Sequence, residues 1–105
     1  MTLDDIATIL ESTGYPVSYY DFDEAPSFPC ICYKENDRNP IKADDGIVEN
    51  LKNIRIEVYS SKHKSLEAEQ AVEAVLSDNG IIFDFTDVGR IEDESLYEVT
   101  YDIQI

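Results

Sequence analysis

The sequence predicts an α+β fold, in which two helices accompany a single mainly antiparallel sheet in the order α-β-β-β-α-β-β. Residues 53–59 alternate apolar and polar side chains, and residues 65–78 then carry apolar side chains at helical spacing. Residues 95–105 alternate as regularly, which is typical of an antiparallel strand with one solvated face. A strand that leads directly into an amphipathic helix should lay that helix on the sheet.

Both predicted helices carry capping signals. Thr2 can cap the first helix, with Asp5 completing a weakened capping box, and Gly14 follows its end. Ser65 can cap the second helix, and Gly80 tolerates the left-handed conformation that stops it. The apolar stripes of the two helices are Leu3, Ile6, Ala7, Leu10 and Ala68, Ala71, Val72, Val75, Leu76.

The first two predicted strands are residues 15–22 and 28–35, joined as a hairpin by a loop of about five residues. Pro29 should lie at the beginning of its strand or at a sheet edge, because it cannot donate to the ladder. Residues 36–46 are rich in turn formers and predict a polar loop.

The next segment, residues 47–60, predicts one long twisted strand, or two strands with a bulge near Asn50. After the second helix, residues 81–85 are short and apolar, as in a strand. Residues 86–90 are expected to be irregular, before the last strand at 95–105.

Charge is distributed unevenly along the 105 residues, whose net charge is −15. Residues 1–33 hold six acids and no base, whereas residues 65–105 hold eleven acids and one base. Seven of the eight basic residues lie in 34–64. This distribution disfavours direct nucleic-acid binding, because no large basic patch can form to neutralise phosphates. A solvated acidic surface and a subunit suited to head-to-tail assembly both remain open.

Residues that could carry catalysis or bind a metal are sparse. Cys30 and Cys32 lie two apart on a predicted strand and are expected to fill core, since zinc would need further ligands. His63 lies in a loop between two lysines, with no nucleophile or orienting partner indicated. The acidic turn Asp44-Asp45 lacks the spacing of a calcium loop. We therefore expect no enzyme activity, no metal and no cofactor.

The sequence also carries a prediction about the compartment. No apolar run approaches the roughly 20 residues that span a bilayer, and the acidic start does not resemble a signal peptide. No membrane partner is expected, and a cytoplasmic protein with reduced cysteines is predicted.

Five segments, in this order and spacing, resemble a family of small phage and prophage proteins of Gram-positive bacteria, which belong to the head–tail connection and tail-completion class of long-tailed phages. These segments are Tyr15–Phe22, Ala25–Tyr33, Ile54–Ser60, Glu73–Leu76 and Leu96–Val99.

The resemblance implies one tail-terminator-like domain over residues 1–105, similar in fold to the lambda tail terminator. Such subunits form a ring, commonly a hexamer, that caps the tail tube and offers a surface to the head connector. The resemblance further implies a virion component, assembled in the cytoplasm of the bacterial host. DNA would be only cargo passing through the ring, and the family supplies no catalytic residue.

A closed ring uses a head-to-tail contact between two different surfaces. The mixed-charge segment 34–64 is predicted to be one side and an acidic segment the other, while further acidic residues line the lumen. The candidate subunit-interface residues are Lys34, Arg38, Lys42, Arg55, Lys62 and Lys64. Charge reversal of Lys34, Arg38 and Lys42 should impair ring formation, and the loop 36–46 is expected to order on contact with a partner.

Two other functions remain open at this point. One is a different head-completion or minor capsid component of the same particle. The other is an acidic inhibitor that mimics DNA, which the net charge of −15 favours.

Overall fold

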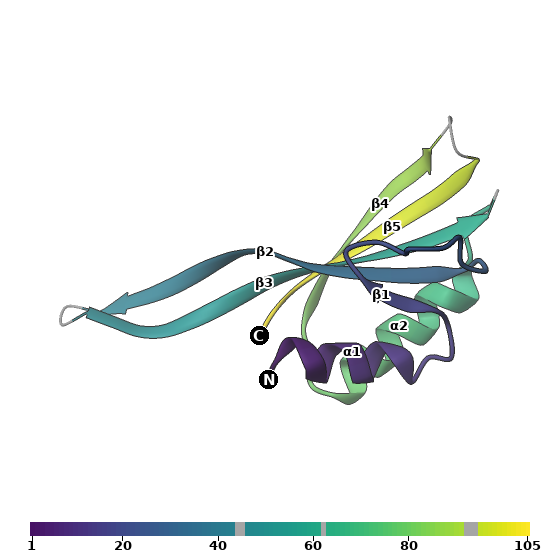
Figure 1. Cartoon of the computed structure of the whole chain (residues 1–105). Helices are drawn as coiled ribbons and strands as arrows, with labels where there is room; N and C mark the ends of the chain where they lie inside the picture. The colour runs from purple at the N-terminus through teal and green to yellow at the C-terminus, as the bar shows by residue number, and fades with distance from the viewer. Residues whose placement is uncertain (44–45, 62, 92–94) are drawn as a thin grey trace.

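The structure is a computed structural model that describes residues 1–43, 46–61, 63–91 and 95–105, with side chains left out at 37–43 and 46–51. Its elements follow the predicted order. They are α1 (Leu3–Glu11), β1 (Val17–Tyr19), β2 (Cys30–Ala43), β3 (Gly46–Ser61), α2 (Leu66–Asp78), β4 (Phe83–Ile91) and β5 (Leu96–Gln104). The strands form one mixed sheet in the order β1-β2-β3-β5-β4 (Figure 1), so the predicted α+β class is confirmed.

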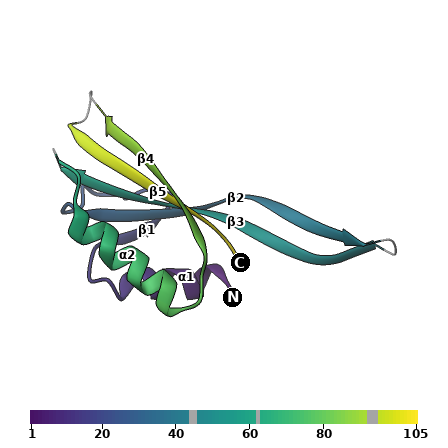
Figure 2. The same cartoon turned by 180° about the vertical axis from the view of Figure 1, so that it is seen from behind.

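Both helices lie on the same side of the sheet, as Figures 1 and 2 show from opposite directions. The predicted caps are present. The Thr2 hydroxyl accepts from the Asp5 amide at 3.2 Å while the Asp5 carboxylate accepts from the Thr2 amide at 2.8 Å. The Ser65 hydroxyl accepts from the Ala68 amide at 3.2 Å, and Gly80 has a φ of 70° just after α2. None of the described helices is both long and apolar enough to cross a bilayer.

The hydrophobic core lies between these helices and one face of the sheet. The predicted alternation is confirmed at Ile54, Ile56 and Val58, which are all at most 1% exposed. Their register partners on β5, Ile103, Tyr101 and Val99, are at most 3% exposed, and Thr100 between the last two is buried as well. Tyr101 is the largest of the fully buried side chains among the described residues. The core cluster contains Ile6, Leu10, Ile31, Tyr33, Ile54, Ile56, Val58, Ala68, Val72, Leu76, Ile81, Val99, Tyr101 and Ile103.

The prediction of an antiparallel hairpin between the first two strands is wrong. β1 pairs with β2 in parallel, with Val17 opposite Ile31 and Tyr19 opposite Tyr33. Tyr20 has a φ of 72°, so the chain turns sharply at the end of β1. Residues 20–29 then run back as a crossover, because parallel strands cannot be joined by a tight turn.

The prediction of a polar loop over 36–46 is also wrong for the residues that the structure describes. β2 continues to Ala43 and β3 begins at Gly46, so the two strands form one long hairpin. Its register shifts between Glu35 and Asp37 and again between Ile41 and Lys42. Backbone pairing with β3 overrides the turn-forming composition, and bulges absorb the residues that do not fit the ladder. The alternative of one long strand for 47–60 is confirmed, and residues 44–45 lie outside the described residues.

The expectation of irregular structure at 86–90 is wrong as well. These residues belong to β4, which pairs antiparallel with β5 along its whole length. A register shift between Asp87 and Gly89, with a φ of 99° at Gly89, accommodates the sequence that looked irregular. The turn composition therefore marks a bulge within an edge strand.

Candidate assembly surfaces

A two-stranded arm projects from the body of the molecule. We use "the arm" for residues 36–43 and 46–51 of β2 and β3. β5 pairs with β3 from Asn53 onward, Ile105 just after β5 still exchanges two backbone hydrogen bonds with Lys52, and β1 pairs with β2 only at residues 31–33. The arm therefore has two open edges within the described residues, and it lengthens the molecule to 51 × 28 × 25 Å (Figure 1).

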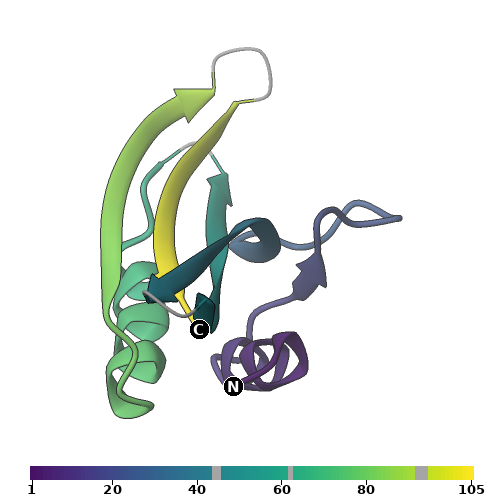
Figure 3. The ribbon, with the colours of Figure 1, turned by 90° about the vertical axis from the view of Figure 1, so that its left-hand side faces the viewer.

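The two outer edges of the sheet body lie on opposite sides of the molecule, as Figure 3 shows with the arm pointing toward the viewer. β4 forms one edge and β1, with the crossover 20–29, forms the other. The direction from edge to edge therefore runs across the direction in which the arm projects.

The β4 edge is exposed and partly apolar. Ile82 just before the strand is 89% exposed, Phe85 is 41% exposed and Val88 is 52% exposed. The ammonium group of Lys64 lies 5.4 Å from the centroid of the Phe85 ring. The Phe85 ring also lies 5.3 Å from the ring of Tyr101, which fixes its position against the core.

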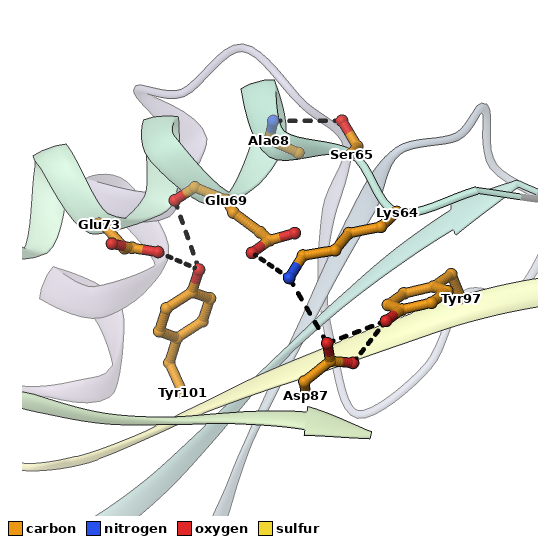
Figure 4. Close-up of polar contacts among 8 residues, drawn as sticks. All are labelled: Lys64, Ser65, Ala68, Glu69, Glu73, Asp87, Tyr97 and Tyr101. Atoms are coloured by element: carbon orange, nitrogen blue, oxygen red, sulfur yellow. Dashed lines mark hydrogen bonds and ion pairs between the residues drawn. The ribbon is translucent and has the colours of Figure 1, made fainter. Parts of the chain in front are cut away.

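Behind this edge, Lys64 joins two carboxylates from different elements (Figure 4). Its ammonium group lies 3.5 Å from Glu69 Oε1 on α2 and 3.5 Å from Asp87 Oδ2 on β4. The Tyr97 hydroxyl donates to both Asp87 oxygens, at 2.7 and 2.9 Å. This donation and the nearby ammonium hold the pKa of Asp87 below its usual value. The cluster ties the beginning of α2 to the edge strand.

Glu69 is the buried member of this cluster. Its side chain is 7% exposed, and its Oε2 atom has no hydrogen-bond partner among the described residues. Burial raises the pKa of Glu69, although Lys64 opposes the rise. Next to it, the Tyr101 hydroxyl donates to Glu73 Oε2 at 2.8 Å and lies 3.4 Å from the Glu69 carbonyl oxygen. The spacing of Glu69 from Val72 and Leu76, three and seven residues on, is a sequence signal for this apolar face.

The opposite edge carries exposed aromatic rings. We use "the aromatic edge" for Tyr19, Tyr20 and Phe28, which are 46%, 64% and 41% exposed. The ring of Tyr19 stacks edge-on against Tyr33 at 5.1 Å, and its centroid lies 6.5 Å from that of Tyr20. The ammonium group of Lys34 lies 5.5 Å from the centroid of the Tyr20 ring. Nothing in the sequence pattern distinguishes these exposed rings from the buried aromatic residues.

The sheet face opposite the helices carries a polar row. Arg55 donates to the two oxygens of Asp102 at 2.9 and 3.5 Å, and the Tyr59 hydroxyl donates to Glu57 at 3.0 Å. Burial, together with a hydrogen bond to Glu57, raises the pKa of Glu98 to about 7. Glu98 therefore binds a proton at a higher pH than an exposed glutamate does.

The two cysteines lie on this same face and are buried free thiols, 2% and 6% exposed. Burial raises the pKa of Cys30 to about 11 and that of Cys32 to about 12. Both therefore stay protonated at neutral pH, as unreactive thiols do. Among the described residues, no three His, Cys, Asp or Glu side chains converge as metal ligands.

The three predicted interface residues whose side chains the structure describes do not lie on one surface. Lys34 and Arg55 are register partners on neighbouring strands, whereas Lys64 lies next to β4, at the other edge. Arg38 and Lys42 lie in the arm, outside the residues whose side chains are described, and Lys62 lies outside the described residues altogether. The assignment of these residues to an interface stays a prediction.

An open groove of about 790 Å³ lies where the arm leaves the body. Asn36 and Asn53 line it at the base of the arm, and Ile82 and Asp84 line it at the beginning of β4. The groove therefore continues from the arm onto the exposed β4 edge.

Comparisons of the chain with models of protein families and with curated proteins find no match.

Proposed function

We propose that this chain is a non-enzymatic, ring-forming tail terminator or tail-completion subunit at the head–tail junction of a phage or prophage particle. The observation that carries the proposal is the arm. It projects from the sheet, and among the described strands no third strand pairs with either of its two.

An isolated two-stranded hairpin is marginally stable in water, since it buries little apolar surface. Open strand edges also invite pairing with other chains. An arm of this length is therefore best explained by a partner that covers it. Because the arm projects across the edge-to-edge direction (Figure 3), it can reach a tail tube or a head connector stacked on a ring of copies.

The charge of the chain supports the same role. A net charge of −15 on 105 residues disfavours attraction to DNA phosphates. A ring built from such subunits would let DNA pass without retaining it, because like charges repel along the channel.

The first test is the absolute mass by light scattering after size exclusion, with electron microscopy of large species. We expect a closed ring, commonly a hexamer in this class, at concentrations up to about 1 mM. A monomer throughout that range would contradict the proposal. A second test addresses the arm: a variant in which residues 39–51 are replaced by a two-residue Asn-Gly turn, between the register partners Arg38 and Lys52.

The shortened variant should keep the fold and form the ring, but it should no longer cap tail tubes assembled from the tube protein of the same genome. Electron micrographs of tube ends show the difference directly. If the shortened variant capped tubes as well as the unmodified chain does, the arm would not be needed for capping. Co-purification with empty heads rather than tails would instead identify another head-completion or minor capsid component.

The net charge of −15 also favours a second candidate, an acidic DNA mimic. A mimic would act as a monomer or dimer and bind a DNA-processing enzyme with an affinity that falls steeply with added salt. Ring formation would argue against it, whereas salt-sensitive binding of such an enzyme by the monomer would favour it.

A further inference from the structure

The exposed apolar side chains of the sheet body gather at its two outer edges. Tyr19, Tyr20 and Phe28 lie at the aromatic edge, and Ile82, Phe85 and Val88 lie at the β4 edge. Scattered exposed apolar residues are ordinary, but grouped ones mark interaction surfaces. The chain thus offers two different surfaces on opposite sides (Figure 3).

The β4 edge has open backbone groups as well. β4 pairs with β5 alone among the described strands, so one side of its backbone lacks a partner strand. An uncovered edge strand with apolar side chains is a liability that proteins normally cover. The groove beside Ile82 adds a hollow at the beginning of this edge, suitable for an inserted aromatic side chain.

Charges at the two edges are partly complementary. The crossover carries the acids Asp21, Asp23 and Glu24, whereas the β4 side carries Arg90 and also Lys64, which is shared with Glu69 and Asp87 of its own edge. In the reverse direction, Lys34 at the aromatic edge matches Asp84 on β4. Oppositely charged groups around an apolar contact fix its orientation and exclude wrong partners.

We propose that the aromatic edge of one copy packs on the β4 edge of the next copy, as the head-to-tail contact of the ring. The proposal rests on the proposed ring-forming function and names its subunit interface. One heterologous contact covers both edges, and repetition of that contact closes a ring. It also assigns Lys34 and Lys64 to opposite sides of the same interface. It leaves the arm free for the axial partner, and so departs from the sequence-based prediction that Arg38 and Lys42 belong to the ring contact.

Two variants test this contact. Tyr20→Ser with Phe28→Ser disables the aromatic edge, and Ile82→Ser with Val88→Ser disables the β4 edge. Each variant alone should be monomeric, because every contact needs both edges. An equimolar mixture should form a heterodimer and stop there, since only one intact contact is available between the two variants.

Light scattering after size exclusion measures the masses, and circular dichroism confirms that each variant folds. Leu66→Ser is the control, because Leu66 is 62% exposed but lies at the beginning of α2, outside both edges. The control should assemble like the unmodified chain.

The outcomes separate this inference from the proposed function. Rings formed by either edge variant alone, or a mixture that stays monomeric, would overturn the edge contact while leaving a ring-forming function intact. Dimers formed by one edge variant alone would indicate a two-fold contact and overturn the head-to-tail arrangement. A monomeric unmodified chain up to about 1 mM would overturn both.

Discussion

The ammonium group of Lys64 lies 3.5 Å from Glu69 Oε1, while the second oxygen of this carboxylate is buried and has no partner among the described residues (Figure 4). A buried carboxylate with one cation and one unpaired oxygen is costly to ionise. The chain thus keeps an acidic group within the packed junction between α2 and β4, where burial raises its pKa and Lys64 opposes the rise.

Lys64→Met should destabilise the fold at about pH 8, and by less at about pH 4.5. Without the ammonium, the pKa of Glu69 rises further above its usual value, so stability falls as pH rises through the folded-state pKa. Urea denaturation at the two pH values measures the difference. Lys52→Met, which removes a lysine from the middle of β3, is the charge-matched control. An equal loss at both pH values would contradict the coupling to Glu69.

Tyr101→Phe should destabilise the fold by about 1 kcal/mol or more, because it removes a buried donor to Glu73. Tyr97→Phe removes a hydroxyl that donates to Asp87 at a solvated position and should cost about half of that or less. Thermal or urea unfolding of the two variants gives the comparison. Equal losses in the free energy of unfolding would show that burial does not determine how much each hydroxyl contributes to stability.

The raised pKa of Glu98 should make stability depend on pH. The folded-state pKa is raised to about 7, so the folded state holds a proton that the unfolded state releases at lower pH. The free energy of unfolding should therefore fall by about 2.5 kcal/mol as pH rises from about 4.5 to about 7. Glu98→Gln should remove this component, whereas Glu67→Gln on the exposed side of α2 should keep it. A Glu98→Gln variant with an unchanged pH profile would contradict the raised pKa of Glu98.

The two thiols should react slowly in the folded protein. Cys30 and Cys32 are buried and their pKa values are raised to about 11 and 12, so little thiolate is present at about pH 8. We expect modification by a disulfide reagent to be about a hundredfold slower than in the urea-unfolded chain. Absorbance of the released thiol follows the reaction. Rapid modification of both thiols in the folded state would indicate that this sheet face opens readily.

Local sequence patterns predicted the strands that bury one face and the helix starts that a capping residue stabilises. The alternation around Ile56 and Tyr101 located two central strands, since one buried face imposes a period of two. The caps at Thr2 and Ser65 placed the helix starts, because a cap acts within one turn. The burial of Glu69 was missed, although its spacing from Val72 places it on the apolar face of α2.

The pairing of strands could not be predicted in the same way. The short distance between β1 and β2 along the chain favoured a hairpin, but Tyr20 turns the chain into a crossover and makes the pair parallel. Turn-forming residues near Asn39 and Gly89 indicated loops, whereas ladder pairing with β3 and β5 holds both segments in strands. Such pairing depends on distant partners and on bulges.

The sequence by itself determined the α+β class, the order of the elements, the helix caps and the segregation of charge, because each depends on residues close together in the chain. Only the tertiary structure decided the parallel first pair, the projecting arm and the two exposed edges. Those features depend on which strands pair with each other. A strand edge is exposed only where no further strand pairs with it. The candidate assembly surfaces are therefore a property of the assembled sheet, with Tyr20 and Phe85 brought to opposite sides by its strand order.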